Sequence, residues 1–288
     1  MVLEMIRINN ITRGRFGNRI LQYNSLMQIA NILNTEASCS KWEGHNFFKN
    51  VATEKESNNS QVFLNWESVL EPDIKSLPVE TDYYIDDPAN CLHGVFYKVT
   101  DIDPRNFLEI KDEYKKDLSS GTVHVGIHFR GTDIISGDGN EGREIHYPRY
   151  YIDAINLVEG EFENTHYHLC TDDLSFESFL QTIRFLAYKG LKFSTGSSSD
   201  YFEDFATLAE CDVLIASSST FVVCAGFIGK ENKKIIHSKD WIDKNLIHQP
   251  WRKKQDPTDV RKFQIAVDNF WIQLYNGGNK FYNAWRFV

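Results

Sequence analysis

Between residues 123 and 238, short apolar runs alternate with amphipathic stretches, and this alternation limits the possible folds more than any other feature of the sequence. Strands are predicted at 123–129, 166–170, 191–194, 212–217 and 233–238, and helices at 147–158, 176–187, 200–209 and 220–228. Strands and helices that alternate at this spacing form a parallel sheet with helices on both faces. The predicted fold class is therefore α/β.

The N-terminal part of the chain is less regular. The segment 5–9 predicts a strand, and a turn with two glycines follows at 12–19. The apolar side chains that follow, from Ile20 to Leu33, recur on one face of a predicted helix.

The sequence also predicts where the chain divides. Residues 105–117 predict a further helix, and the Ser-Ser-Gly sequence at 119–121 is typical of a junction. We therefore expect an N-terminal domain of residues 1–118, a second domain of residues 119–240, and a helical tail of residues 241–288.

The tail has a distinct composition. It holds four of the six tryptophans and eight Lys or Arg against four Asp or Glu, on a chain whose net charge is −9. One interpretation is a helical cap whose aromatic side chains pack back on the body. The other is a surface for a membrane-linked or anionic substrate.

Composition excludes several classes of protein. With 288 residues, 42% of them hydrophobic, the chain is neither disordered nor collagen-like. An acidic chain repels a phosphate backbone, which argues against general nucleic-acid binding. Five scattered cysteines without a C-x-x-C pair argue against structural zinc or a disulfide framework. With neither a signal peptide nor an apolar run of about 20 residues, we expect a cytoplasmic protein.

Polar motifs follow three of the predicted strands. They are His128-Phe129-Arg130-Gly131-Thr132-Asp133, Thr171-Asp172-Asp173 and Ser217-Ser218-Ser219-Thr220-Phe221. Ligands bind at the carboxyl ends of strands in open α/β sheets. A hydroxyl-rich helix start suits a phosphate, an arginine can bind a diphosphate through two parallel hydrogen bonds, and a carboxylate can bind a ribose or base. Each motif alone is also an ordinary cap or loop, but together they favour a nucleotide-sugar site.

The order of motifs along the chain resembles that of GDP-fucose-dependent fucosyltransferases, in particular the bacterial α-1,2-fucosyltransferases of glycosyltransferase family 11. Gly14-Arg15-Phe16-Gly17-Asn18-Arg19, followed by Ile20-Leu21-Gln22-Tyr23, resembles their G-x-[LF]-G-N-Q…Q-[YF] opening, and its G-R-F-G-N run is also similar to protein O-fucosyltransferases. His128-x-Arg130-x-x-Asp133 resembles H-x-R-R-G-D, Tyr150-Tyr151 with Ala154-Ile155 resembles Y-Y…A-I, Cys170-Thr171-Asp172-Asp173 resembles F-S-D-D, and Ser219-Thr220-Phe221 resembles S-[ST]-F. These matches span residues 14–229.

The chain departs from the family pattern at several positions. Arg19 stands where the family has Gln, and Gly131 and Thr132 replace the second Arg and the Gly of R-R-G-D. Val222-Val223 replaces an aromatic pair. These departures bear on the sugar and the acceptor more than on the fold.

The resemblance implies a GT-B-like architecture, with two Rossmann-like domains facing across a cleft and the C-terminal one holding the nucleotide sugar. It implies a glycosyltransferase that moves L-fucose from GDP-β-L-fucose to a glycan hydroxyl, with inversion and an α-1,2 linkage to a galactose-like residue, in surface polysaccharide or O-antigen synthesis. No metal cofactor is expected. The expected partners are the donor and a glycan acceptor, with peripheral contact of residues 241–288 to the inner membrane face if the acceptor is lipid-linked.

The resemblance also implies roles for individual residues. In the donor site, Arg130 is expected to bind the β-phosphate with help from Ser218, Ser219 and Thr220, Asp172 or Asp173 to hold guanine or ribose, and Arg15 and His128 to contribute further contacts. Phe221 is expected either to pack on the nucleotide or to fill the core.

Three expectations concern catalysis. Asp133 is the candidate base for the acceptor hydroxyl, unless it only orients Arg130. Asn18 is expected to position the acceptor or the diphosphate, unless it is an N-cap. Glu141 and His146 are expected to belong to a flexible lid on the acceptor side.

Three alternatives stay open. A metal-dependent GT-A transferase would use Asp172-Asp173 as a degenerate D-x-D motif. A non-catalytic module would bind a nucleotide or glycan without turnover. A transferase of the same fold could use a different GDP-hexose.

Overall fold

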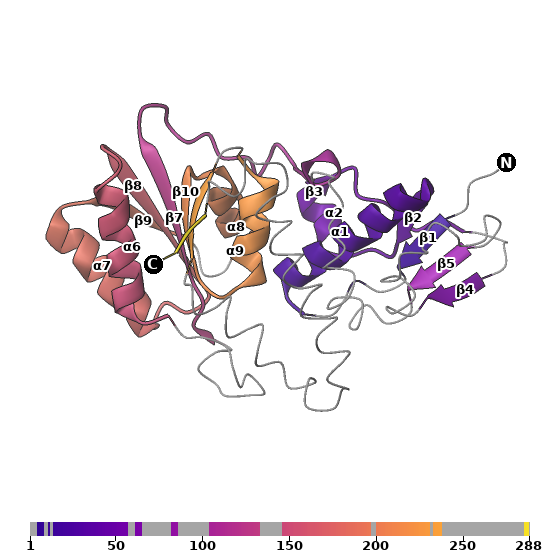
Figure 1. Cartoon of the computed structure of the whole chain (residues 1–288), viewed down its shortest axis with the longest axis horizontal. Helices are drawn as coiled ribbons and strands as arrows, with labels where there is room; N and C mark the ends of the chain where they lie inside the picture. Colours follow the sequence, from indigo (N-terminus) through magenta and orange to yellow (C-terminus); the bar gives the residue numbers. More distant parts are fainter. Residues whose placement is uncertain are drawn as a thin grey trace. The chain divides into compact units, whose positions relative to one another are not determined.

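The computed structural model describes residues 5–8, 11, 14–56, 61–64, 82–85, 104–132, 146–196, 200–230, 233–237 and 285–287. These residues divide into two compact units, one ending at Lys111 and the other beginning at Asp112 (Figure 1). Both units are built on parallel sheets.

The first unit contains a four-stranded parallel sheet in the order β2-β1-β5-β4. Its elements are β1 (Met5–Ile8), α1 (Phe16–Leu33), β2 (Glu36–Cys39), α2 (Gly44–Phe47), β3 (Phe48–Lys49), β4 (Gln61–Leu64), β5 (Asp82–Ile85), η3 (Pro104–Asn106) and β6 (Glu109–Ile110). The predicted strand and helix at the N-terminus are confirmed. The fully buried Tyr23 and Leu26 on α1 form part of the core.

The helix predicted at 105–117 is wrong. A single 3-10 turn and the two-residue strand β6 occupy this stretch, and β6 pairs antiparallel with β3. Leu108 and Ile110 are buried while Glu109 between them is exposed. This two-residue period belongs to a strand, and it outweighs the helical propensity of the lysines and glutamates that follow.

The second unit contains a six-stranded parallel sheet in the order β12-β11-β10-β7-β8-β9. Its strands are β7 (Val123–Phe129), β8 (Thr165–Thr171), β9 (Lys192–Thr195), β10 (Val213–Ala216), β11 (Lys234–His237) and β12 (Trp285–Phe287). Its helices are α6 (Pro148–Glu159), α7 (Glu177–Lys189), α8 (Tyr201–Glu210) and α9 (Thr220–Ile228). Every strand and helix predicted between residues 123 and 238 is confirmed.

Local signals set the ends of these helices. Pro148 occupies the first turn of α6, and Gly190 ends α7 in the left-handed conformation with φ +68°. The Asp200 carboxylate accepts hydrogen bonds from the backbone N–H groups of Phe202 and Glu203, as an N-cap residue does. These signals explain why the predicted boundaries agree with the structure to within about two residues.

The two faces of the sheet are covered by different helix pairs. Figure 1 shows α6 and α7 together on one side of the sheet and α8 and α9 on the other. Val125, Ile127 and Phe129 alternate along β7 and pack into the same buried cluster as Tyr151 and Phe179. Along the chain, β8 and β9 are added in turn on one side of β7. The next strand, β10, then pairs with the other side of β7. The strand order therefore reverses between β7 and β10, which is where this class of sheet binds ligands.

A short strand from the tail extends the sheet. β12 pairs parallel with β11. These three residues of 241–288 thus form a strand, whereas we expected a helical cap, and the rest of that segment lies outside the described residues. Within the part of the chain that the structure describes, no helix is both long and apolar enough to cross a membrane.

The described cysteines are free and buried. Burial raises the pKa of the Cys39 and Cys211 thiols to about 12. They pack as small apolar side chains, as the sequence predicts for Cys211. Cys91 lies outside the described residues.

Candidate functional site

The ends of β7 and β10 meet at the point where the strand order reverses. Ile215 pairs with Ile127, and continuing this register brings Ser218 level with Arg130. Arg130 is half-buried, and its Nη1 donates a hydrogen bond to the Ser218 carbonyl oxygen at 3.1 Å. The guanidinium is thereby held beside the start of α9.

The start of α9 is rich in hydroxyl groups. Ser217, Ser218 and Ser219 are all buried, and the Ser219 hydroxyl accepts a hydrogen bond from the Phe221 N–H at 3.3 Å. Ser219 is thus the N-cap of α9, and Thr220 is its first residue. A helix start combines backbone N–H donors with the positive end of the helix dipole, which favours an anion.

His128 and Phe221 pack against each other next to this turn. The His128 Nδ1 lies 2.6 Å from the Ser217 hydroxyl oxygen, and its ring stacks on Phe221 at 5.3 Å between centroids. Phe221 also meets Phe205 edge to face at 5.2 Å. Both rings therefore have packing roles in the fold.

The Asp172 carboxylate is directed at the loop that follows Arg130. It accepts hydrogen bonds from the Gly131 N–H at 2.7 Å, the Thr132 N–H at 3.3 Å and the Thr132 hydroxyl at 2.7 Å. The sequence predicts a nucleotide contact for this residue. In the structure, its Oδ1 binds the backbone next to Arg130 and its Oδ2 binds the Thr132 hydroxyl.

Asp173 stabilises its own turn. Its Oδ1 accepts hydrogen bonds from the Ser175 N–H at 2.8 Å and from the Ser175 hydroxyl at 2.6 Å. Gly131 packs closely on this turn, since a Cβ at that position would lie 2.9 Å from the Cβ of Asp173. This contact explains why position 131 is a glycine here, where the resembling family has an arginine.

The structure gives His146 and Tyr150 a place in the site that the sequence analysis did not assign to them. His146 is buried, and its Nε2 lies 3.2 Å from the Ser218 hydroxyl oxygen. Its ring packs on Tyr150 at 4.4 Å, and the Tyr150 hydroxyl donates to the Ala216 carbonyl oxygen at 2.7 Å. The expectation that His146 belongs to a flexible lid is wrong because its side chain is packed inside the site. The Y-Y motif pointed to Tyr150, but no motif pointed to His146.

Tyr151 contacts the carboxyl end of β7, next to the site. Its hydroxyl approaches the His128 carbonyl oxygen at 3.5 Å. Burial and, to a smaller extent, the charge of Asp172 raise the pKa of Tyr151 well above its ordinary value. The phenol is therefore neutral throughout the physiological range and serves as a hydrogen-bond donor.

The glycine turn of the first unit positions Arg15 and Asn18. Gly14 has φ +79°, and a Cβ there would come within 2.3 Å of the Asn18 Nδ2. The N-cap of α1 is the exposed Arg15 rather than Asn18, which lies within the first helical turn. The N-cap alternative for Asn18 is therefore wrong. Arg19 donates to the Gly14 carbonyl oxygen at 3.0 Å and pairs with Glu43, so it anchors the turn.

Two expected site residues, Asp133 and Glu141, lie outside the described residues. Among the residues that are described, no group of three or more His, Cys, Asp or Glu side chains is arranged to hold a metal ion. The site at the switch point is built from one arginine, hydroxyl groups and backbone donors. Such a set has the chemistry that suits an anion.

Comparison with known proteins gave matches in structure and not in sequence. No family model matches the chain, and no curated protein matches it. The structure of POFUT1 in complex with GDP superposes with a TM-score of 0.56 at 10% identity, covering 82% of this chain and 98% of that chain. The structure of Arabidopsis thaliana FUT1 in complex with GDP gives a TM-score of 0.52 at 12% identity, covering 82% and 70% of the two chains.

A third structure extends this set. NodZ, described as an α-1,6-fucosyltransferase soaked with GDP-fucose, gives a TM-score of 0.51 at 13% identity and covers 83% of this chain and 96% of that one. Matches at this level of identity are matches of fold. The predicted fold class is confirmed: the chain has the α/β, GT-B-like fold of these fucosyltransferase structures.

Proposed function

We propose that this protein is a metal-independent, inverting glycosyltransferase that moves L-fucose from GDP-β-L-fucose to a hydroxyl of a glycan. The observation that carries the proposal is the convergence of Arg130, Ser218 and the start of α9 at the switch point of the second unit. The ordered motifs support fucose as the sugar. Structures of similar fold that hold GDP or GDP-fucose add further support.

The chemistry requires stabilisation of the GDP leaving group. Negative charge accumulates on the β-phosphate as the bond between the sugar C1 and the phosphate oxygen breaks. Arg130 and the positive end of the α9 dipole are fixed before the reaction starts, so they stabilise this charge without reorganising. Because the protein supplies these positive groups itself, the proposed reaction needs no metal.

The aspartates after β8 take different roles. Asp172 holds the backbone of Gly131 and Thr132, so we propose that it positions Arg130. Asp173 keeps its place as the candidate for a guanine or ribose contact, through the Oδ2 that its turn does not use in the contacts to Ser175.

The proposed reaction is a single displacement. The acceptor oxygen attacks C1 of fucose from the face opposite the phosphate, its proton passes to Asp133, and GDP leaves, which inverts the anomeric centre. We further propose that the acceptor is O2 of a galactose-like residue, giving an α-1,2 linkage. For Arg15 and Asn18 we propose the donor-binding and positioning roles that the resemblance implies.

A cellular setting follows from this chemistry. Surface polysaccharide or O-antigen precursors offer such acceptors on lipid carriers at the inner membrane face. The tail, 241–288, carries eight basic and four acidic side chains. A basic, tryptophan-rich segment suits contact with an anionic membrane surface, and we propose that role for a cytoplasmic enzyme.

A donor screen tests the proposal. Thermal unfolding is measured with GDP-, UDP- and dTDP-sugars, and a ligand at a hundred times its Kd should stabilise the protein by about 2.7 kcal/mol. We expect stabilisation by GDP and GDP-fucose alone. A larger response to another GDP-hexose or to a UDP-sugar would contradict fucose as the donor sugar.

Turnover assays complete the test. With galactosides as acceptors, GDP-fucose should be consumed in excess EDTA and the product should carry an α-1,2 linkage by NMR. Loss of activity on chelation, restored by Mn²⁺, would favour the metal-dependent alternative. Binding of GDP-fucose without turnover on any acceptor would indicate a binding module.

A further inference from the structure

We propose that His146 is a positioning residue for donor binding, which fixes the Ser218 hydroxyl so that it donates to the diphosphate. The inference rests on the function proposed above. Ser218 is held from two sides, because Arg130 binds its carbonyl oxygen at 3.1 Å and the Nε2 of His146 lies 3.2 Å from its hydroxyl oxygen.

The imidazole is itself fixed on several sides. Its ring packs on Tyr150 at 4.4 Å and meets Tyr151 edge to face at 6.2 Å. The His146 carbonyl oxygen accepts a hydrogen bond from the Ser178 hydroxyl at 2.8 Å. Backbone and ring are therefore both held, and the residue is 5% exposed.

Tyr150 ties this arrangement to the strands of the site. Its hydroxyl lies 2.7 Å from the Ala216 carbonyl oxygen and 3.2 Å from that of Ile236, at the ends of β10 and β11. His146 precedes α6, and Ser178 belongs to α7, both on one face of the sheet. The Ser218 hydroxyl belongs to the turn that starts α9, on the other face. His146 thus joins the two faces across the carboxyl edge of the sheet.

The tautomer of His146 decides where the Ser218 proton points. A serine hydroxyl donates one hydrogen bond and accepts others. If the Nε2–H of His146 donates to the hydroxyl oxygen, the hydroxyl proton is left to point at a phosphate oxygen. Without His146 the hydroxyl can rotate toward backbone acceptors, and part of the donor affinity is lost.

Two substitutions separate the hydrogen bond from the packing. His146→Phe keeps a ring against Tyr150 but removes the donor, and His146→Gln keeps an N–H near the Nε2 position but removes the ring. We expect His146→Phe to raise the Kd of GDP and the KM of GDP-fucose about tenfold, with kcat changed less than about twofold. His146→Gln should stay within about threefold of wild type for all three constants.

Two further variants serve as controls. His166→Phe changes a histidine at the amino end of β8, whose Nε2 contacts Ser194, and should bind GDP as wild type does. Ser218→Ala removes the hydroxyl itself, so adding His146→Phe to it should weaken GDP binding no further. If His146→Phe alone folds poorly, Ser218→Ala still tests the inference. A hydroxyl that donates to the diphosphate must strengthen GDP binding, so wild-type GDP binding by Ser218→Ala would overturn the inference.

The outcomes distinguish this inference from the function it rests on. If wild type binds no GDP by calorimetry, both proposals are overturned. If wild type binds GDP and His146→Phe binds it equally well, only this inference is overturned. Equal weakening by His146→Phe and His146→Gln, or an additive loss with Ser218→Ala, would show a packing role and overturn it as well.

Discussion

Single residues at the switch point divide into those that can meet the donor and those that hold them in place. Arg130 and the Ser218 turn carry the donors, whereas Asp172 supports the loop behind Arg130. The division matters for mutagenesis because removing a support alters binding through geometry, and removing a contact alters it directly.

Arg130→Lys separates charge from geometry. A lysine keeps the charge but cannot make two parallel hydrogen bonds to a diphosphate. We expect kcat/KM for GDP-fucose to fall about ten- to a hundredfold, the effect of one or two charge-assisted hydrogen bonds. Arg149→Lys, at an exposed arginine on α6, is the matched control and should retain wild-type rates. Wild-type kcat/KM for the Arg130 variant would remove this residue from the site.

Asp172→Asn tests the supporting role. An amide can accept from the Gly131 N–H but cannot also accept from the Thr132 hydroxyl through its second atom. We expect a loss of about 1–2 kcal/mol in stability by urea unfolding and a higher KM for the donor. Asp173→Asn retains an Oδ1 acceptor for Ser175 and should leave stability unchanged. A normal KM for GDP-fucose in both variants would exclude both aspartates from donor binding.

Asp133→Asn distinguishes a base from an orienting carboxylate. If Asp133 is the base, this substitution should lower kcat by roughly 10²–10⁴ and change the Kd of GDP little. If it orients Arg130 instead, the Kd should rise and kcat at saturating donor should be spared. Calorimetry and steady-state rates on the one variant decide between the two, and normal values for both would refute each role.

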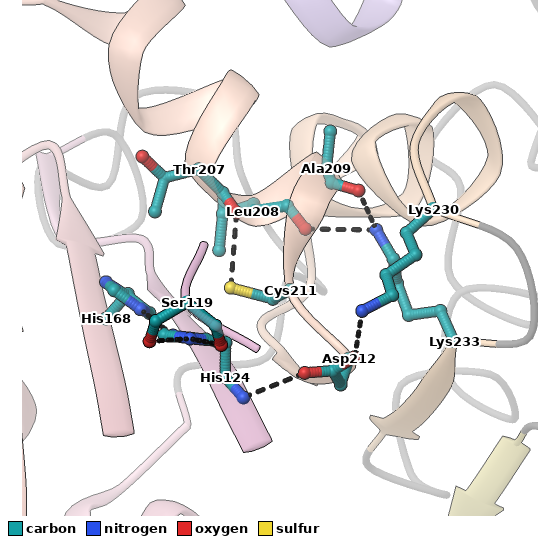
Figure 2. Close-up of polar contacts among 10 residues, drawn as sticks. All are labelled: Ser119, His124, His168, Thr207, Leu208, Ala209, Cys211, Asp212, Lys230 and Lys233. Atoms are coloured by element: carbon teal, nitrogen blue, oxygen red, sulfur yellow. Dashed lines mark hydrogen bonds and ion pairs between the residues drawn. The ribbon is translucent and has the colours of Figure 1, made fainter. Parts of the chain in front are cut away.

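At the scale of elements, the ends of α8 and α9 depend on one buried cation. Figure 2 shows the Lys233 ammonium beside the last turn of α8, where it donates to the Leu208 and Ala209 carbonyl oxygens at 3.0 and 2.6 Å. It also donates to the Ala225 carbonyl oxygen of α9 at 3.1 Å. Burial lowers the pKa of Lys233 to about 8, so the ammonium form still predominates at neutral pH.

Lys233→Met should destabilise the protein by about 2–4 kcal/mol, because it leaves buried carbonyl groups at two helix ends without this donor. Lys230→Met is the natural comparison. Lys230 pairs with Asp212 at a more exposed position, and its removal should cost less than about 1 kcal/mol. Urea unfolding of both variants provides the measurement. Equal losses would mean that the helix ends do not rely on Lys233.

For the whole molecule, we expect acid stability to depend on His166 and His168, which lie beside His124 in the second sheet. The His124 Nδ1 lies 2.9 Å from the His168 Nε2, and the His166 and His168 rings stack at 4.6 Å (Figure 2 shows His124 and His168). Burial, with the neighbouring His166 and His124, lowers the pKa of His168 to about 4. Burial and neighbouring positive groups, including Lys192, also lower the pKa of His166.

The sign of the pH effect follows from these shifts. Below about pH 6.5, His168 is protonated in the unfolded chain but stays neutral in the folded protein. The free energy of unfolding therefore falls as the pH drops from about 6.5 toward 4. We expect the melting temperature to be about 5 °C lower at pH 5 than at pH 7.5. His168→Gln should flatten this dependence. The same slope in wild type and variant would assign the acid sensitivity to other groups.

Much of the second unit could be predicted because its signals are local. Alternation along 123–129, the helical spacing of 176–187, Gly190 as a stop and Asp200 as a cap depend only on nearby residues. The motifs at the strand ends also predicted that Arg130 and the serine turn lie together, because all strands of a parallel sheet end at the same edge.

By itself, the sequence determined the α/β class, the helices and strands of the second unit, and which strand ends carry polar side chains. Only the tertiary structure decided that Asp172 meets residues 131–132, that His146 reaches Ser218, and that Trp285–Phe287 joins the sheet. The physical reason is the separation along the sequence over which each interaction acts. Backbone propensity and periodicity act between neighbours in the sequence, whereas hydrogen-bond partners 41 or 72 residues apart depend on strand order and register, which the packing of the whole sheet sets.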